Sequence, residues 1–317
     1  MGDTHEQLRI GAAQVAEVFM DREATVEKDC EYIWKAGEQG LDLLVFPEFH
    51  VPTSPWTHTY GETGLERREF YKRLFDNAVT VPGPAIDRLC EAAREADTVV
   101  VVGVTEKEPD TAGTMYNTLV FIDSDGTLLG KRRKLVPTSS ERLFHAGGTG
   151  KDIRTFDSSV GTLGGLMCSE HTNQLAGFSM LAGGADLHAA AWPVFANRDR
   201  ENRERVVGTL TRYQAYVGCL PTVCATGVVT DDLAESIGNP DLDRDSGTSS
   251  VISPTGETLA GPRYEGEGLV YADVDMGDRV RAKSLHDLVG HYNRFDVFTL
   301  EIDKGPQDPT RIVGDPD

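Results

Sequence analysis

Three short motifs in this chain carry side chains that could cooperate in nucleophilic catalysis, and the first of them supplies a carboxylate. The apolar run 43–46 ends in Pro47, and Glu48 follows directly. Because proline cannot continue a central strand, Glu48 is expected at a strand end beside the core. Burial there raises the pKa of a carboxyl group toward that of a useful general base. Taken alone, Glu48 is better explained as a helix cap or a surface charge.

The second motif is a run of four cations, residues 131–134, followed by the apolar segment 135–137. Most of these cations are expected to be solvated, since a run of charges usually marks an exposed face. Lys134 is different, because the apolar segment behind it indicates that the chain turns inward there. A buried ammonium group needs a carboxylate partner, and it can also stabilise negative charge that develops on a substrate.

The third motif is a candidate nucleophile, Cys168, which follows the glycine-containing apolar strand 163–167 and precedes a helical stretch. A junction of strand, turn and helix exposes a nucleophile and places backbone N–H groups nearby as oxyanion donors. A thiol near a helix N-terminus and a lysine is also expected to ionise more easily. The other thiols are predicted to be buried and structural, and their odd, scattered set favours reduced cysteines over disulfides: Cys30, Cys90, Cys219 and Cys224.

The elements that must position these residues follow an α/β pattern, in which short aliphatic runs alternate with helical stretches. The predicted strands are 8–13, 41–46, 98–104, 118–122, 153–156, 162–167, 187–191, 222–226, 249–252 and 268–274. The predicted helices are 22–39, 66–77, 85–96, 173–182 and 201–216.

Turn signals and loops suggest how these elements are connected. Residues 123–126 and 253–256 each end an apolar strand with turn-forming residues and a glycine, which predicts two antiparallel hairpins. The long acidic stretch 230–248 is expected to be a lid, an interface insert or a mobile loop. Because no linker or repeat divides the chain, a single domain is predicted.

Composition narrows the classes of function. The chain has 317 residues, with 51 acidic and 31 basic side chains and a formal charge of −20. This charge argues against nucleic acid or an anionic membrane as the main partner. No apolar stretch approaches the ~18 residues of a membrane span, and the first residues lack a signal pattern, so a cytoplasmic protein is expected.

Neither a metal nor a nucleotide is expected. The histidines and cysteines lack the spacing of metal-ligand motifs, which predicts that no metal is bound. The glycine-rich segment 147–151 faintly resembles a phosphate-binding loop, but Asp152 stands where serine or threonine would be required.

Taken together, the three motifs resemble the nitrilase superfamily of carbon–nitrogen hydrolases, and its nitrilase branch in particular. The resemblance rests on Phe46-Pro47-Glu48, on residues 133–138 with Glu141 and Arg142 close behind, and on residues 165–170. Shorter segments support it over roughly residues 8–303: 11–14, 81–84, 116–119, 191–193 and 290–298.

The resemblance implies a four-layer α-β-β-α sandwich in one domain, with a core of about residues 8–303 and a tail at 304–317. It implies a catalytic set of Glu48, Lys134 and Cys168, with Glu141 orienting Lys134 and the substrate. Glu48 would take the thiol proton while Cys168 attacks a nitrile carbon, and Lys134 and the Ser169 N–H would stabilise the oxyanion. A thioimidate and then a thioester would lead to a carboxylic acid and ammonia, without metal or organic cofactor.

One departure from the family pattern bears on the substrate. The residue after the nucleophile is often tryptophan in nitrilases, and here it is Ser169, which should leave more room. The change also makes the alternatives of an amidase or of a nitrile or cyanide hydratase slightly stronger, although a nitrilase is still the leading expectation. A non-catalytic oligomeric scaffold is a further alternative, but the presence of all four catalytic residues speaks against it.

The remaining candidates are weaker. Side chains predicted to contact substrate are Ser169, His171, Trp56, Tyr60, Trp192 and Pro193, with His58 in the same loop as Trp56. For the aromatic candidates, packing in the core or on the surface explains the residue at least as well. Members of this superfamily associate through helices near the nucleophile, so segments 173–182 and 201–216 are candidate surfaces for a homodimer or a larger spiral.

Overall fold

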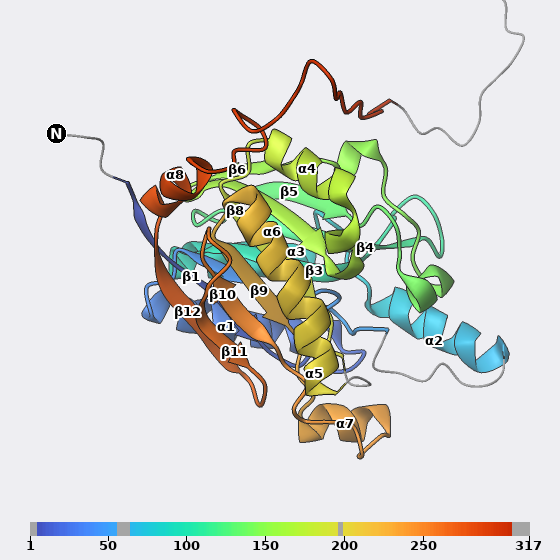
Figure 1. Cartoon of the computed structure of the whole chain (residues 1–317). Helices are drawn as coiled ribbons and strands as arrows, with labels where there is room; N and C mark the ends of the chain where they lie inside the picture. Colours follow the sequence, from blue (N-terminus) through green and yellow to red (C-terminus); the bar gives the residue numbers. More distant parts are fainter. Residues whose placement is uncertain (1–4, 56–63, 196–198, 306–317) are drawn as a thin grey trace, which may run out of the picture.

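The computed structural model describes residues 5–55, 64–195 and 199–305. In this part of the chain two six-stranded β-sheets pack face to face, and helices cover their outer faces (Figure 1). The predicted α-β-β-α sandwich is therefore confirmed. In the described residues no helix has both the length and the apolar character needed to cross a membrane.

The first sheet combines parallel strands at its centre with antiparallel strands at its edges. The strands β1, β2 and β3 are mutually parallel. β12 pairs antiparallel with β1, β4 with β3, and β5 with β4. In spatial order the sheet contains β12 (Gly268–Asp275), β1 (Gln7–Gln14), β2 (Leu43–Val45), β3 (Val99–Lys107), β4 (Met115–Ile122) and β5 (Leu128–Arg133).

The second sheet repeats this topology. Its strands β7, β8 and β9 are mutually parallel. β6 pairs antiparallel with β7, β10 with β9, and β11 with β10. In spatial order it contains β11 (Thr258–Arg263), β10 (Ser249–Ile252), β9 (Thr222–Thr226), β8 (Leu187–Trp192), β7 (Gly161–Met167) and β6 (Phe156–Ser158). The two sheets thus have similar arrangements of strands, and the candidate site is formed by the different residues at the ends of those strands.

Apolar side chains from both sheets fill the space between them. Leu43, Leu119 and Phe121 of the first sheet pack in one buried cluster with Met167 and Ala189 of the second. Gly165 lets the sheets approach closely, because a Cβ atom there would lie 2.8 Å from Leu119 Cδ1 and 2.9 Å from Phe121 Cζ. The packing of the sheets therefore determines how close the end of β7 comes to the first sheet.

Helices α1 and α3 cover the first sheet, and α4 and α6 cover the second. Their starts carry ordinary helix signals: Asp21 caps α1, Pro84 is the first residue of α3, and the Asn173 side chain accepts hydrogen bonds from two N–H groups of α4. The helices are α1 (Arg22–Glu38), α2 (Gly64–Asn77), α3 (Pro84–Ala96), α4 (Gln174–Ala182), α5 (Arg200–Arg203), α6 (Thr209–Gly218), α7 (Asp231–Ile237) and α8 (Gly277–Lys283).

Both predicted hairpins are confirmed. β4 pairs with β5 and β10 with β11, and their turns contain Gly126 and Gly256 with φ of +84° and +81°.

Three predictions need correction. The strand expected at 153–156 spans Phe156–Ser158, and the helix expected at 201–216 is divided into α5, a π-helical turn (Glu204–Gly208) and α6. The stretch expected to be a loop at 230–248 contains α7, because Thr230 caps a helix that begins with two aspartates.

Candidate active site

The nucleophile predicted from the sequence lies at the junction of β7 and a short 3₁₀ helix, Cys168–Thr172, that leads into α4. Cys168 has φ of +48°, a left-handed conformation that is uncommon for a residue other than glycine. Its thiol lies 3.7 Å from the Ser169 hydroxyl, and the residue is only 4% exposed. The predicted junction of strand, turn and helix is thus present, with the strained backbone that often marks functional positions.

A buried ammonium group lies between two buried carboxylates. Lys134 Nζ lies 2.7 Å from Glu48 Oε1 and 2.8 and 3.0 Å from the two oxygens of Glu141. Glu48 follows β2, Lys134 follows β5, and Glu141 belongs to a 3₁₀ helix, Ser139–Leu143, that Thr138 caps. The Thr138 N–H donates to Glu141 Oε2 at 2.9 Å and so helps to hold this carboxylate. The chain therefore brings together three of its predicted catalytic side chains.

Two further residues set the position of Glu48. Asn117 on β4 donates its side-chain N–H to Glu48 Oε1 at 2.6 Å, and the Glu48 N–H donates to the Trp192 carbonyl at 3.2 Å. Gly103 on β3 lets the Glu48 loop pass closely, since a Cβ there would lie 2.2 Å from the Pro47 carbonyl. Asn117 was not predicted to be a site residue, although it stands in one of the segments that carry the family resemblance.

The second oxygen of Glu48 is buried and has no hydrogen-bond partner among the residues that the structure describes. Burial raises the pKa of Glu48 to about 7; Lys134 opposes this shift and Glu141 adds to it. Burial lowers the pKa of Lys134, but interactions with Glu48, Cys168 and Glu141 together raise it by a larger amount. The pKa therefore lies above its ordinary value, and the ammonium group stays protonated. Glu48 thus combines a pKa suited to a general base with an oxygen free to accept a proton.

The expectation that the Cys168 thiol ionises easily is wrong. Burial, aided by the charge of Glu48, raises its pKa to about 12, and the opposing effect of Lys134 is smaller. The Cys168 thiol is therefore neutral at rest and would need a base to remove its proton before it could act as a nucleophile.

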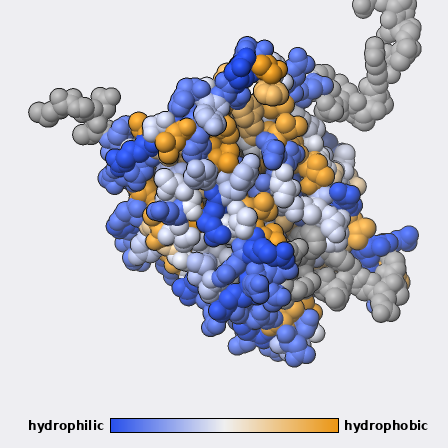
Figure 2. All heavy atoms as spheres, in the orientation of Figure 1, coloured by the Kyte–Doolittle hydropathy of each residue, from blue (hydrophilic) through white to orange (hydrophobic). Residues whose placement is uncertain are grey.

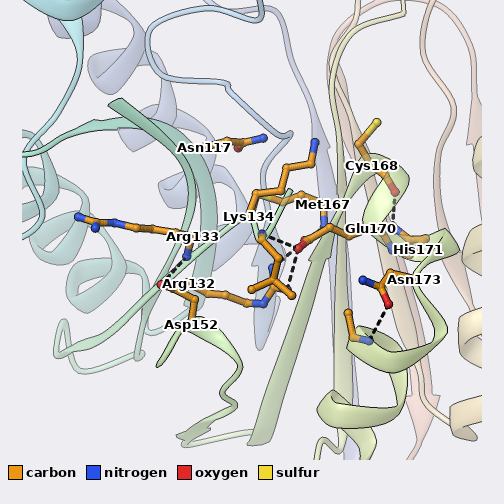
Figure 3. A network of polar contacts seen from close by, with 12 residues as sticks. Asn117, Arg132, Arg133, Lys134, Asp152, Met167, Cys168, Glu170, His171 and Asn173 are labelled. Carbon is orange, nitrogen blue, oxygen red and sulfur yellow. Dashed lines mark hydrogen bonds and ion pairs between the residues drawn. The ribbon is translucent and has the colours of Figure 1, made fainter. Parts of the chain in front are cut away.

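A second buried ion pair joins the ends of β5 and β7. Arg132 donates to both oxygens of Glu170, at 2.7 and 3.0 Å, and the N–H groups of Leu135 and Met167 donate to the same carboxylate at 2.9 and 3.1 Å (Figure 3). Burial alone would raise the pKa of Glu170, but Arg132 and these hydrogen bonds lower it below the usual value. This carboxylate is a fixed anion that ties the strand before Lys134 to the strand before Cys168.

The expectation that most cations of the run 131–134 are solvated is also wrong. Arg132 is 3% exposed, and Lys131 and Arg133 both bind the buried Glu106 of β3. Glu106 and Glu170 lie 25 or more residues away along the chain from the cations that they bind. A local sequence pattern therefore cannot reveal the carboxylates that bind these cations in the interior of the protein.

His171 and Trp192, both predicted to contact substrate, lie buried close to Cys168. The His171 ring stacks on Trp192 with centroids 4.7 Å apart, and Trp192 Nε1 donates to the Thr211 hydroxyl at 3.2 Å. Burial lowers the pKa of His171 to about 4 and that of its neighbour His188 well below its ordinary value. Pro193, which follows β8, is buried as well. Contact of these three residues with substrate stays a prediction.

Ser169 lines a cavity of about 250 Å³, and Glu48, Lys134, Glu141 and Cys168 are not among the described residues of its wall. The wall of this cavity is formed by the segments that follow β5 and β7: Leu135, Val136, Pro137, Thr138, Arg142, Ser169, Glu170, Thr172 and Asn173. Trp56, His58 and Tyr60 lie outside the described residues. Within the described part of the chain, no group of histidine, cysteine and carboxylate side chains could hold a metal ion.

Comparisons with known proteins agree with this site. The family model of carbon-nitrogen hydrolases matches residues 9–284. A protein named nitrilase 2, from an unknown prokaryotic organism, is 38% identical, and the match covers 96% of this chain and 95% of that protein. The aliphatic nitrilase of Rhodococcus rhodochrous is 35% identical, with 96% and 85% covered.

Solved structures share the fold at lower identity. A carbon-nitrogen hydrolase from Helicobacter pylori aligns with a TM-score of 0.71 and 19% identity, covering 89% of this chain and 94% of its own. Nit3 of Saccharomyces cerevisiae, a member of branch 10 of the nitrilase superfamily, aligns with a TM-score of 0.71 and 20% identity, covering 89% and 95%. With the family model matched over most of its length, the chain belongs to the carbon–nitrogen hydrolase family of the nitrilase superfamily, as its three motifs predicted.

Proposed function

We propose that the protein is a nitrilase that hydrolyses an organic nitrile to a carboxylic acid and ammonia. The observation that carries this proposal is the buried Lys134 ammonium held between Glu48 and Glu141, whose charges act on the Cys168 thiol. Relatives named nitrilase, 31–38% identical over nearly the whole chain, support it. The set supplies a nucleophile, a base and a fixed cation, which are the groups that hydrolysis of a carbon–nitrogen bond needs.

The first step is the attack of Cys168 on the nitrile carbon. Because the pKa of the thiol is raised to about 12, its proton leaves while the sulfur–carbon bond forms. Glu48 accepts this proton on the oxygen that has no partner in the described structure and passes it to the nitrile nitrogen. The product is a covalent thioimidate, and Glu48 is again a carboxylate.

The second step replaces nitrogen by oxygen. Glu48 removes a proton from a water that attacks the thioimidate carbon, and the nitrogen leaves as ammonia after it gains protons. A thioester remains, and a second water releases the carboxylic acid and restores the thiol. Lys134 and the Ser169 N–H stabilise the negative charge on oxygen in these tetrahedral states.

The same residues can yield other products. If the thiol leaves the tetrahedral state before ammonia does, the product is an amide, as in a hydratase. If the pocket accepts amides, the protein acts as an amidase. Ser169 follows Cys168 directly, so its small side chain leaves room for substrates that a larger residue would exclude.

The experiment that tests the proposal measures ammonia and identifies products from aliphatic, arylacetic and aromatic nitriles and from their matching amides. The Cys168→Ala variant is the control for background hydrolysis. Acid and ammonia from nitriles alone support the nitrilase. Hydrolysis of amides alone would replace it by an amidase, and amide as the main product from nitriles would replace it by a hydratase.

We also propose that the protein forms a homo-oligomer through the face of α4 and α6. Leu175 on α4 is 63% exposed, and Tyr213 and Tyr216 on α6 are 42% and 49% exposed. Figure 2 shows apolar side chains gathered over α4 and the adjoining C-terminal segment. A groove of about 710 Å³ lies between α4 and residues 289–302.

Light scattering tests the assembly. The wild-type protein is expected to run as a dimer or a larger species, and Leu175→Arg combined with Tyr213→Arg is expected to reduce its mass. A monomeric wild-type protein over the range of concentrations used for activity would contradict the proposal.

A further inference from the structure

A buried histidine, His171, contacts the carbonyl group of the peptide bond between Cys168 and Ser169. His171 Nδ1 lies 2.8 Å from the Cys168 carbonyl oxygen, and His171 is 1% exposed. On its other side, His171 Nε2 lies 3.0 Å from Nε2 of His188, which is fully buried. The pair is therefore placed to act on the backbone of the nucleophile.

These partners determine where the protons lie on both rings. A carbonyl oxygen can only accept, so His171 Nδ1 must carry a hydrogen and donate it. Since burial lowers the pKa of His171 to about 4, its ring is neutral near pH 7, and Nε2 is then an acceptor. His188 must therefore donate from its own Nε2.

The direction of the Cys168 carbonyl determines the direction of the next N–H. A trans peptide is planar, so the C=O of Cys168 and the N–H of Ser169 point to opposite sides. In Figure 3 the Cys168 carbonyl faces His171, while the Cys168 side chain points away from it. The Ser169 N–H is thus directed away from the histidine, toward the side of the thiol.

Other contacts prevent the His171 ring from turning. Its face stacks on Trp192 at an interplanar angle of 16°, and Trp192 is anchored by its hydrogen bond to Thr211. Ser169 lies in the first turn of the 3₁₀ helix, where N–H groups have no partner within the helix and are free for a ligand.

From this geometry we propose that His171 is a positioning residue that directs the Ser169 N–H toward the oxyanion of the reaction, and that His188 holds His171 in the required tautomer. The inference rests on the proposed function, in which this N–H stabilises the oxyanion. It assigns to the two histidines a role that needs no contact with substrate.

The first test removes the donor but keeps an aromatic ring. His171→Phe retains a ring that can stack on Trp192, but it cannot hold the Cys168 carbonyl. Loss of one oxyanion donor costs ~10²- to 10³-fold in kcat, and a donor that remains but is misdirected costs less, about 10- to 100-fold. KM is expected to change less than threefold. His171→Asn is the matched variant, because its amide can donate from a position close to Nδ1, and its kcat should recover to within about fivefold of wild type.

A second measurement separates the oxyanion donor from the nucleophile. Iodoacetamide alkylates a thiol by forming a sulfur–carbon bond while iodide leaves; the thiol proton passes to a base, and no oxyanion develops. The rate of Cys168 alkylation, followed by peptide mass spectrometry, should therefore be the same in wild type and His171→Phe. Equal losses of alkylation and turnover would show that the histidine merely supports the nucleophile, and unchanged kcat would overturn the inference directly.

His188 provides the third test. His188→Phe removes the donor to His171 Nε2, so the tautomer is no longer enforced and kcat is expected to fall about tenfold. His188→Gln restores an N–H donor and should recover most of the loss. Equal turnover in His188→Phe and wild type would remove His188 from the proposal.

Assays of the wild-type protein on nitriles and amides distinguish these outcomes from a failure of the proposed function. If it hydrolyses amides rather than nitriles, the nitrilase assignment fails. The same variants are then compared on the amide, because acyl transfer from an amide develops an oxyanion at the same N–H.

Discussion

Two buried clusters of cation and carboxylate lie at the end of β5, and they behave in opposite ways. In the pair of Arg132 and Glu170, both carboxylate oxygens accept two hydrogen bonds each, and the pKa of Glu170 is lowered. In the cluster of Lys134, Glu48 and Glu141, one oxygen of Glu48 lacks a partner in the described structure, and the pKa of Glu48 is raised to about 7. Burial is common to both. The number of donors around each carboxylate decides whether it is a fixed anion or a proton acceptor.

The largest effect is expected from removing the proposed nucleophile, Cys168. The cluster of Lys134, Glu48 and Glu141 acts on the Cys168 thiol, whereas the pair of Arg132 and Glu170 only supports the backbone beside it. Cys168→Ala is expected to reduce ammonia release by at least about 10⁴-fold, as loss of a nucleophile does in other hydrolases. Circular dichroism and oligomer mass should stay as in wild type. Substantial turnover in this variant would disprove the assignment of the nucleophile.

Neutralising Glu48 should abolish base catalysis without unfolding the protein. Glu48→Gln is nearly isosteric and leaves Lys134 paired with Glu141. We expect kcat to fall about 10²- to 10⁴-fold, the usual contribution of a general base. Steady-state kinetics and urea unfolding on the same preparation test this, and a large loss of stability with modest loss of kcat would contradict it.

The matched change in the other cluster should act mainly on stability. Glu170→Gln leaves the Arg132 guanidinium buried without its counter-charge, which typically costs about 3–5 kcal/mol. The free energy of unfolding from urea titration measures this loss, and Glu48→Gln serves as the control. If both variants lose similar stability, the distinction between a fixed and a reactive carboxylate fails.

The two carboxylates also differ in their effect on pH dependence. Glu48 must be ionised to act as a base, and its pKa is raised from the ordinary 4.5 to about 7. Below pH 7, kcat/KM should therefore fall about tenfold per pH unit, and above pH 7 it should reach a plateau. A profile measured between pH 4 and 9 tests this. An acid limb near pH 4.5 would show that burial does not shift the base.

Much of the site could be predicted from the sequence, because its motifs join strand ends to reactive side chains over a few residues. Proline after an apolar run located Glu48, and a glycine-rich strand before a helix located Cys168. β9 and β10 have the predicted bounds, 222–226 and 249–252. Local patterns of this kind depend on neighbouring residues alone.

Contacts between distant strands could not be predicted in this way. Asn117 and Glu48 are 69 residues apart, and Arg132 and Glu170 are 38 apart. Which of them meet depends on strand register and on the packing of the two sheets, which no short segment encodes. For the same reason the run 131–134 suggested solvated cations, and the easy ionisation expected for Cys168 neglected its burial.

The proposed catalytic groups are divided between the two layers of the sandwich. Glu48 and Lys134 follow strands of the first sheet, Cys168 follows a strand of the second, and the layers meet where Gly165 faces Leu119 and Phe121. A slip of about 1 Å between the layers would leave every strand hydrogen bonded and yet cost about 10²-fold in rate by displacing the base from the thiol. On heating, the enzyme should therefore lose activity at a lower temperature than the one at which its secondary structure melts. The turnover rate would then report changes in the distance between the two sheets.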